Sequence, residues 1–191
     1  MHIAGLDLAA KEDRCSGFAV IRVNKPKPKL IFLKCLSTDY EIIGNIIKYG
    51  ISLVAIDAPI TPKPIMREVD RVMIKSGFKV FPPSFSWMKR LSQRAYNLYL
   101  TLRDLGIKII ETHPKSALIS SRVNNVGKLC NLLGISIEGY EEIINRSKDL
   151  RDALISALVA YCYVMNTCVK VVKARDGEIY LIRELVISAN G

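Results

Sequence analysis

The chain is poor in several residue types and patterns that define common protein classes. Its 191 residues include one glutamine, one tryptophan and two histidines. No apolar run reaches the ~18 residues that a membrane span requires. No GxxxxGK[ST] or GxGxxG loop is present, which removes the two commonest nucleotide-binding signatures. We therefore expect a cytoplasmic protein with no membrane partner.

The five cysteines are odd in number and form no CxxC pair. Both facts argue against a disulfide framework and against a structural zinc site. We therefore expect buried thiols in a reducing cytoplasm. Abundant isoleucine beside nearly absent glutamine favours a heat-adapted source, a thermophile.

The positive charge is concentrated in the middle of the chain. The net charge is +10, and residues 60–130 alone hold 13 basic against 4 acidic side chains. Spacing by four residues places several of these basic side chains on common helix faces. One interpretation is a solvated face that keeps the protein soluble. The other is a surface that meets nucleic-acid phosphates. The candidate nucleic-acid-binding residues are Arg67, Arg71, Lys75, Arg90 and Arg94.

The order of apolar segments predicts a mixed sheet flanked by helices. Runs of strand-forming residues at 2–8, 17–23 and 29–36 are separated by short turns, which favours an antiparallel meander. Helical and buried-strand patterns then alternate, and Asp176-Gly177 marks a hairpin near the end. The predicted helices are 39–49, 66–75, 85–105, 125–134, 138–146 and 148–166, and the predicted buried strands are 51–57 and 107–111.

Carboxylates stand at or just beyond the ends of several apolar elements. Asp7, Asp57 and Glu111 end predicted strands. Asp149 and Asp152 open the last long helix on one face. Hard cations such as Mg²⁺ take oxygen ligands, and a two-metal hydrolytic site needs several carboxylates. Each acid also has an ordinary structural explanation, as a turn residue, a surface ion pair or a partner of the helix dipole.

His113 is the one imidazole expected near these acids. It directly precedes Pro114, and a lone histidine at such a place is more typical of a structural role than of a catalytic one. Neither a Ser-His-Asp nor a Cys-His arrangement can be argued from the sequence.

Seven segments lie in order between residue 3 and about residue 163. They are GLDLAA, SGFAVI, AIDAPI, RxxDR, FPPSFxxM, ETHPKSAL and KDLRDALISALVAY. Together they resemble a group of prokaryotic proteins described as predicted nucleases with a ribonuclease H-like fold. The last segment is also similar to the RuvC-type Holliday junction resolvases, in which two acids three residues apart precede an Ala-Leu run.

The resemblance implies a five-stranded mixed sheet, with three antiparallel strands followed by two parallel strands and helices on both faces. It implies one domain over 1–191 with a basic helical insertion at about 60–106. It also implies an acidic cluster of Asp7, Asp57 and Asp152, with Asp149 and Glu111 as candidate additions. Ribonuclease H itself places an acid on its first helix, and Glu41 stands too near the start of helix 39–49 to fill that role.

The leading hypothesis is a phosphodiesterase that uses Mg²⁺ or Mn²⁺ to hydrolyse nucleic acid. Asp7 and Asp57 would hold metal, Asp152 and Asp149 would complete the shell, and Glu111 would orient a ligand or water. One alternative is a nucleic-acid-binding module of the same fold without turnover. Another is a phosphoryl-transfer enzyme of the actin-like ATPase type, although that type duplicates the domain. The expected partners are nucleic acid and a second copy of the chain in a homodimer.

Overall fold

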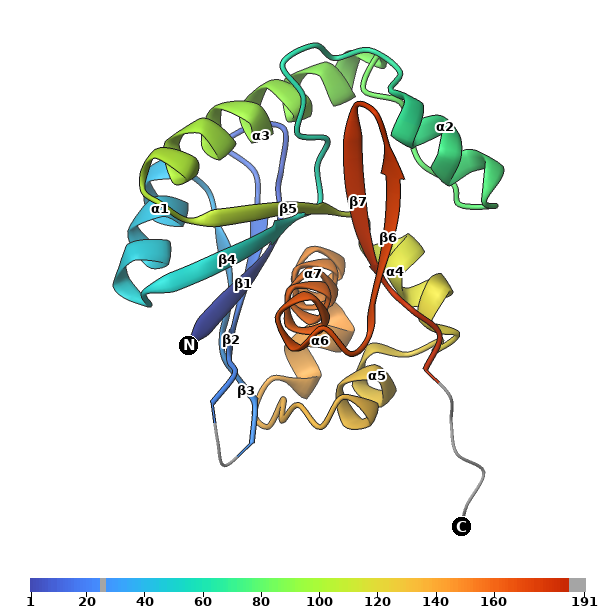
Figure 1. The fold of residues 1–191 in the computed structure, drawn as a ribbon. Coiled ribbons are helices and arrows are strands. Elements are labelled where there is room, and N and C mark those ends of the chain that lie inside the picture. The colour runs from blue at the N-terminus through green and yellow to red at the C-terminus, as the bar shows by residue number, and fades with distance from the viewer. Residues whose placement is uncertain (25–26, 186–191) are drawn as a thin grey trace.

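A seven-stranded mixed sheet forms the centre of the computed structural model, which describes residues 1–24 and 27–185. The strand order across the sheet is β3-β2-β1-β4-β5-β7-β6 (Figure 1). The strands are β1 (His2–Asp7), β2 (Ser16–Arg22), β3 (Lys29–Leu36), β4 (Ile51–Ile56), β5 (Lys108–Thr112), β6 (Val169–Ala174) and β7 (Gly177–Ile182). The helices are α1 (Asp39–Lys48), α2 (Glu68–Lys75), α3 (Ser86–Asp104), α4 (Pro114–Ser121), α5 (Val126–Leu132), α6 (Glu141–Arg146) and α7 (Lys148–Met165).

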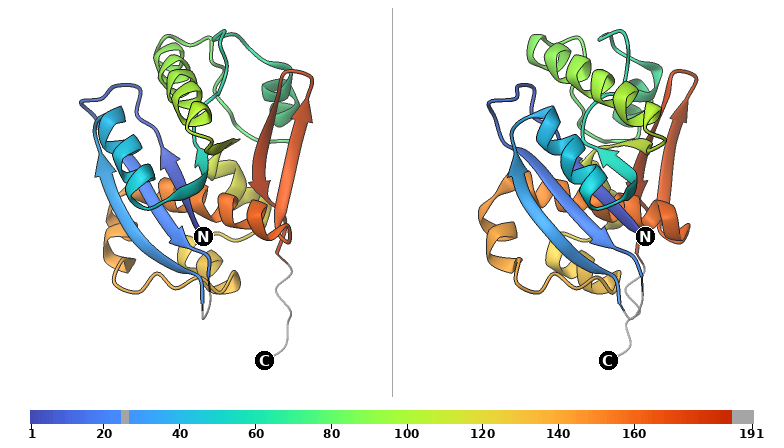
Figure 2. Two further views of the ribbon diagram at one scale, coloured as in Figure 1. Left: turned by 60° about the vertical axis from the view of Figure 1, so that its left-hand side comes forward. Right: turned by 90° about the vertical axis from the view of Figure 1, so that its left-hand side faces the viewer.

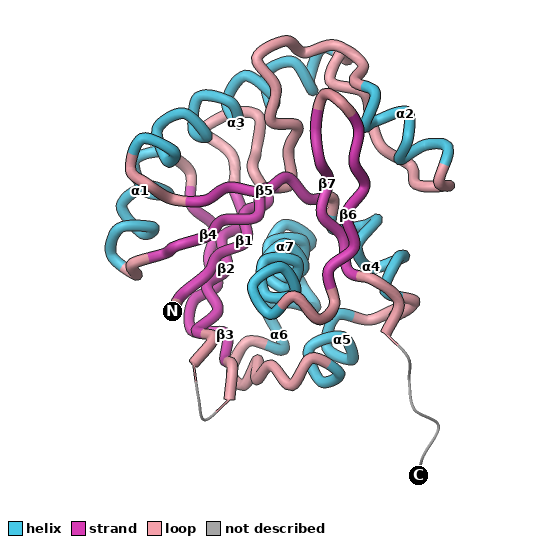
Figure 3. The backbone as a smooth tube through the Cα atoms, in the orientation of Figure 1, coloured by secondary structure: helices cyan, strands magenta, loops and turns pink. Residues whose placement is uncertain are grey.

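The first five strands pair as expected. β1, β2 and β3 form an antiparallel meander, and β4 and β5 then add in parallel beside β1. The predicted total of five strands is wrong, because the β6–β7 hairpin joins the free edge of β5 (Figure 3). The join is short and consists of the pairs Glu111–Ile179 and Thr112–Tyr180. The Asp176-Gly177 signal correctly predicts the hairpin, but a turn signal carries no information about which edge the hairpin will meet.

Local capping explains why helix α1 begins where it does. The Thr38 hydroxyl accepts a hydrogen bond from the Glu41 amide, and the Glu41 carboxylate accepts from the amide of Thr38. This reciprocal arrangement satisfies amides that the first turn leaves without partners. Glu41 is therefore engaged in the helix cap, which is consistent with its exclusion as a site residue.

Helix α7 is the central helix of the fold and contacts every strand of the sheet. Two glycines allow its close approach. A Cβ on Gly5 would lie within 3.0 Å of backbone atoms of Ala153 and Ala157, and one on Gly17 would lie within 3.0 Å of the Asp149 carbonyl. Since no other residue fits there, the glycines of β1 and β2 set the position of α7 and of the acids in its first turns.

The two faces of the sheet carry separate apolar clusters. Residues such as Ile3, Leu53 and Ile110 pack with α7 on one face. Residues such as Leu6 and Ile56 pack on the other face with α1 and α3, which lie together there (Figure 2). Alternating side chains of one strand therefore enter different clusters. Within the described residues, no helix combines the length and the apolar character needed to cross a bilayer.

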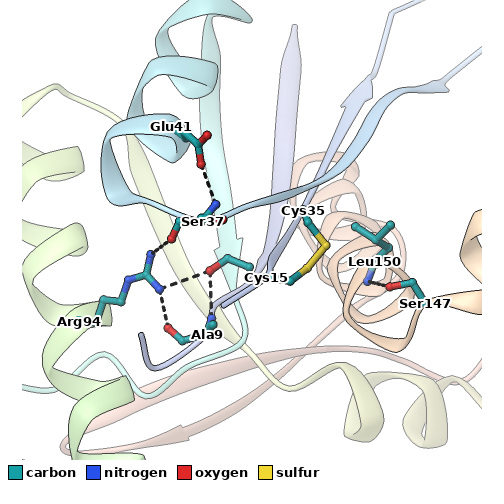
Figure 4. Close-up of a disulfide and its surroundings, with 9 residues drawn as sticks. Ala9, Cys15, Cys35, Ser37, Glu41, Arg94, Ser147 and Leu150 are labelled. Carbon is teal, nitrogen blue, oxygen red and sulfur yellow. Dashed lines mark hydrogen bonds between the residues drawn. A yellow bond between two sulfur atoms is a disulfide. The ribbon is translucent and has the colours of Figure 1, made fainter. Parts of the chain in front are cut away.

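Four of the five cysteines form disulfides, contrary to the expectation of free thiols. Cys15, just before β2, is bonded to Cys35 of β3, with 5.0 Å between their Cα atoms (Figure 4). Cys162 near the end of α7 is bonded to Cys168, just before β6. Only Cys130 is a buried free thiol. The spacing argument fails because the β2–β3 ladder and the α7–β6 turn, rather than proximity in the sequence alone, bring the partners together.

Candidate active site

Asp7 and Asp57 lie side by side at the ends of neighbouring parallel strands. The Asp57 amide, one residue beyond β4, donates to the carbonyl of Leu6 at 2.8 Å. Gly5 of β1 and Ala55 of β4 both face α7. Because side chains alternate along a strand, Asp7 and Asp57 face α7 as well.

Asp149 and Asp152 approach the same place from α7. Ser147 caps the helix by accepting a hydrogen bond from the Leu150 amide, as Figure 4 shows. Asp149 therefore lies in the first turn, with its carbonyl against Gly17. Asp152 lies one turn further along, and its carboxylate is 3.7 Å from the ammonium of Lys148. The structure thus brings together the strand acids and the helix acids.

The acids of the cluster act on one another through their charges. Burial, followed by the charges of Asp152 and Asp149, raises the pKa of Asp7 from 3.8 to about 7. Burial, followed by the charges of Asp7 and Asp152, holds the pKa of Asp57 well above its usual range. Burial also raises the pKa of Asp152, against the opposing effect of Lys148. Negative charge in this cluster is therefore insufficiently compensated by the chain.

The donor set fits a hard divalent cation in its chemistry. The described residues donate no hydrogen bond to the carboxylate of Asp7 or Asp57, and both side chains are half-buried, so their charges are only partly solvated. Oxygen ligands and excess negative charge are what Mg²⁺ and Mn²⁺ require. The positions of the side chains do not by themselves form a metal site. Among residues 1–24 and 27–185, no three carboxylate, imidazole or thiol groups converge on one metal position.

Glu111 faces the other side of the sheet from the other acids, although its charge still contributes to the raised pKa of Asp57. It is paired with Ile56 across the β4–β5 ladder, and its side chain faces away from α7 because Ile110 faces toward it. The Glu111 carboxylate instead accepts from the Arg67 guanidinium and from the Ile60 amide, the latter at 2.9 Å. The expected role of orienting a ligand beside Asp7 finds no support in this placement.

Two of the five expected phosphate-binding residues are buried. Arg67 is 4% exposed and is bonded to Asp70 and Glu111. Arg94 of α3 is 8% exposed and donates to the Asp39 carboxylate. It also donates to the carbonyls of Ala9 and Ser37 (Figure 4). Both guanidinium groups hold loops in place, so neither is free to contact phosphate. The remaining candidates, Arg71, Lys75 and Arg90, are exposed.

The site has two further neighbours: Lys148, which the sequence did not suggest, and His113, which was expected near the acids in a structural role. Lys148 lies at the mouth of the cluster, with its side chain 77% exposed. Its charge acts on Asp7, Asp57 and His113. The four-residue spacing between Lys148 and Asp152 is the sequence signal that would have predicted the position of Lys148 beside the acids. Burial, followed by Lys115 and Lys148, lowers the pKa of His113 to about 4, so the imidazole is neutral at pH 7.

We expect Asp7→Asn to stabilise the protein at pH 8. A folded-state pKa near 7 against 3.8 makes the folded chain bind more protons between about pH 4 and pH 7, so stability falls with rising pH through that window. For one half-buried carboxyl, which solvent partly screens, the loss has an upper bound on the order of 4 kcal/mol. Urea denaturation of variant and wild type at pH 5 and pH 8, with chelator present, measures the difference.

His113 makes the stability change with pH in the opposite direction below about pH 6.5, because there the unfolded chain binds more protons at this residue than the folded chain does. The variant is therefore compared with wild type, in which the contribution of His113 is the same. Asp104→Asn, at an exposed carboxylate on the last residue of α3, is the control and should not alter the pH dependence. An Asp7→Asn protein whose stability difference from wild type is the same at both pH values would contradict the described electrostatics.

Comparison with known structures places this geometry in a known fold. The Thermus thermophilus RuvC structure in complex with a Holliday junction substrate aligns with 87% of this chain and 98% of the RuvC chain, at 16% identity and a TM-score of 0.57. Another Thermus thermophilus RuvC structure aligns over the same shares, at 14% identity and a TM-score of 0.53. No protein-family model matches the sequence, and no curated protein matches it. The chain therefore has the RuvC-like α/β fold at low sequence identity.

Proposed function

We propose that this protein is a divalent-metal-dependent nuclease that hydrolyses phosphodiester bonds in nucleic acid. The observation that carries the proposal is the group formed by Asp7 and Asp57, at adjoining strand ends and without a hydrogen-bond donor among the described residues, and Asp152 on the facing turn of α7. The RuvC-like fold supports it, since the aligned Thermus protein is described in complex with a Holliday junction substrate. Fold alone does not establish activity, so the proposal of metal-dependent hydrolysis depends mainly on the carboxylates.

Each residue has a defined part in this proposal. Asp7, Asp57 and Asp152 provide oxygen ligands, and Asp149 adds negative charge at the edge of the group. A bound Mg²⁺ or Mn²⁺ supplies Lewis acidity at the phosphate and lowers the pKa of water. Lys148, exposed at the mouth, provides a cation for the approaching phosphate backbone. The neutral imidazole of His113 is held through Nδ1 by the hydroxyl of Ser116 at 2.7 Å.

The exposed basic side chains of residues 60–106 provide the wider contact with nucleic acid. Arg71 and Lys75 lie on α2 and Arg90 lies on α3. Phe81, Phe85 and Trp87 are exposed in the same region, and the ring of Phe81 meets each of the other two edge to face. Cations for phosphates beside rings for bases are the components of a nucleic-acid surface. We propose that this basic segment is the main binding surface, while homodimer formation stays a prediction.

Asp7→Asn together with Asp152→Asn is expected to reduce cleavage by at least ~100-fold, because the oxygen ligands of the cation are lost. Wild type and variant are incubated with Mg²⁺ or Mn²⁺ on duplex, branched, single-stranded and RNA–DNA substrates, and the products are resolved on denaturing gels. Nucleic-acid affinity of the variant should stay near that of wild type, because the basic segment is untouched.

Metal binding has a readout that does not depend on cleavage. Mg²⁺ or Mn²⁺ should raise the thermal midpoint of wild type and leave that of the double variant unchanged, because a ligand that binds only the folded state stabilises it. Asp104→Asn is again the matched control and should cleave as wild type does. Metal-independent nucleic-acid binding with no cleavage of any substrate would replace the proposal by the alternative of a binding module without turnover.

A further inference from the structure

The buried guanidinium of Arg94 connects α3 to the segments that follow β1 and β3. It donates to the carbonyl of Ala9 at 2.8 Å, to the carbonyl of Ser37 at 3.1 Å and to the carboxylate of Asp39 at 2.9 Å. Figure 4 shows the guanidinium between Ala9 and Ser37. Because the guanidinium is rigid and most of its acceptors are backbone atoms, these bonds restrict where both segments can lie.

Ala9 is the second residue after Asp7, at the point where the β1–β2 ladder ends. Asp7 forms the last pair of that ladder, with Gly17. Beyond this pair, the Ala9 amide donates to the hydroxyl of Ser16 at 3.1 Å, and the Ala9 carbonyl accepts from Arg94. Side chains therefore hold the chain just beyond Asp7, where the backbone ladder no longer does. The end of a ladder is where local opening starts, so these bonds also limit movement of Asp7.

The segment after Asp57 is also held by a buried side chain, but less directly. The amide of Ile60 donates to the carboxylate of Glu111, which is itself held in a buried ion pair. Both strand-end aspartates are thus followed, within three residues, by a backbone group that a buried side chain holds. Arg94 bonds to the backbone itself, so its effect on the neighbouring aspartate is the simpler one to measure.

We propose that Arg94 is a positioning residue of the metal site, which holds the turn after β1 so that the Asp7 carboxylate stays in place for a divalent cation. The inference rests on the proposed function, because it requires Asp7 to be a metal ligand. Groups that orient metal ligands without touching the metal contribute strongly to affinity, and their loss typically lowers it about 10–100-fold. Arg94 acts through Ala9 and contacts neither the cation nor the nucleic acid.

The test is titration of the full chain with Mn²⁺, followed by the electron paramagnetic resonance signal of the free ion, without thiol reductant so that the disulfides stay intact. Arg94→Met should weaken Mn²⁺ binding roughly tenfold or more. Arg94→Lys should be intermediate, because an ammonium lacks the fork of donors that reaches several acceptors. Ser16→Ala removes the acceptor of the Ala9 amide with little change in volume, and should weaken binding about threefold.

Leu102→Ala is the matched control for lost stability. Leu102 is fully buried on the same helix and bonds to no part of the β1–β2 turn, so its truncation destabilises by leaving a cavity and should not alter Mn²⁺ affinity. Arg94→Met should also keep the nucleic-acid affinity of wild type when chelator is present, because the guanidinium is buried.

The outcomes separate this inference from the proposed function. Wild-type Mn²⁺ affinity in both folded Arg94→Met and Ser16→Ala would overturn the positioning role and leave the proposed nuclease standing. An equal loss of affinity in Leu102→Ala would also overturn it, because the effect would then follow stability alone. Absence of Mn²⁺ binding to wild type would overturn both the positioning role and the proposed metal site.

Discussion

Replacing Gly5 by alanine is expected to lower the free energy of unfolding by about 3 kcal/mol or more, because α7 has no room to accommodate a side chain there. The added Cβ would meet the Ala157 amide nitrogen and the Ala153 carbonyl oxygen, which are backbone atoms of a buried helix and cannot rotate away. Relief requires α7 to move off β1, and the helix contacts the whole sheet. Urea denaturation followed by circular dichroism measures the loss.

A displacement of α7 should also move the carboxylates of its first turns away from those on the strands. Gly17→Ala meets the Asp149 carbonyl, so it pushes the first turn of α7 away from β2. We expect this variant to lose both stability and Mg²⁺-induced stabilisation. Gly44→Ala is the matched control, because nothing lies within 4 Å of its added Cβ on exposed α1. The control should gain about 0.5–1 kcal/mol through helix propensity, and a Gly5→Ala protein as stable as the control would refute the close approach.

Arg67→Met should destabilise the protein by about 3–5 kcal/mol, since it leaves two acids buried without their shared cation. The Arg67 guanidinium donates to Asp70 and Glu111, and all three side chains are less than one-tenth exposed. Glu111 in turn accepts from the Ile60 amide and so secures the chain that follows Asp57. The loss should therefore appear in chemical denaturation and in faster proteolysis of residues 58–67.

A double substitution separates two contributions to the loss of stability: the cost of leaving a buried charge without a partner, and the stabilisation that the ion pair itself provides. Arg67→Met with Glu111→Gln should recover part of the lost stability, because one buried charge is removed with its partner. Arg103→Met is the control, since the Arg103–Asp104 pair is exposed and surface pairs contribute little. If Arg67→Met shifts the denaturation midpoint no more than this control does, the buried network is not stabilising.

Apolar periodicity was sufficient to predict the first five strands and the long helices. Ile42 and Ile46 recur on one face of α1, and the continuous run 51–57 corresponds to buried β4. What periodicity does not reveal is the alignment between strands. Glu111 pairs with Ile56 rather than with the position of Asp57, so it faces the other side of the sheet. One residue of register decides whether an acid joins the cluster, and register is set by tertiary contacts.

Charge patterning identified basic residues without distinguishing their environments. Arg67, Arg71 and Lys75 are evenly spaced, yet Arg67 lies at the helix N-cap, buried against Glu111, while the other two are exposed. The partners of Arg67 and Arg94 are 44 and 55 positions away in the chain. Pairing across such distances depends on how elements pack, so spacing alone cannot separate a loop-holding arginine from one that is available to phosphate.

The two-pair junction between β5 and β7 divides the sheet into units of unequal cooperativity. The first five strands share long ladders, and β6 and β7 share six residue pairs with each other. The hairpin is also held at its tip, where Asp176 accepts from the amides of Glu68 and Val69 at the start of α2. Helix α4 packs on β7, and the Cys162–Cys168 disulfide ties the base of the hairpin to α7. Opening of the β5–β7 junction would therefore let the tip of the hairpin and α2 move together while the base stays tied to α7, and β1, β4 and α7 keep the carboxylates in place.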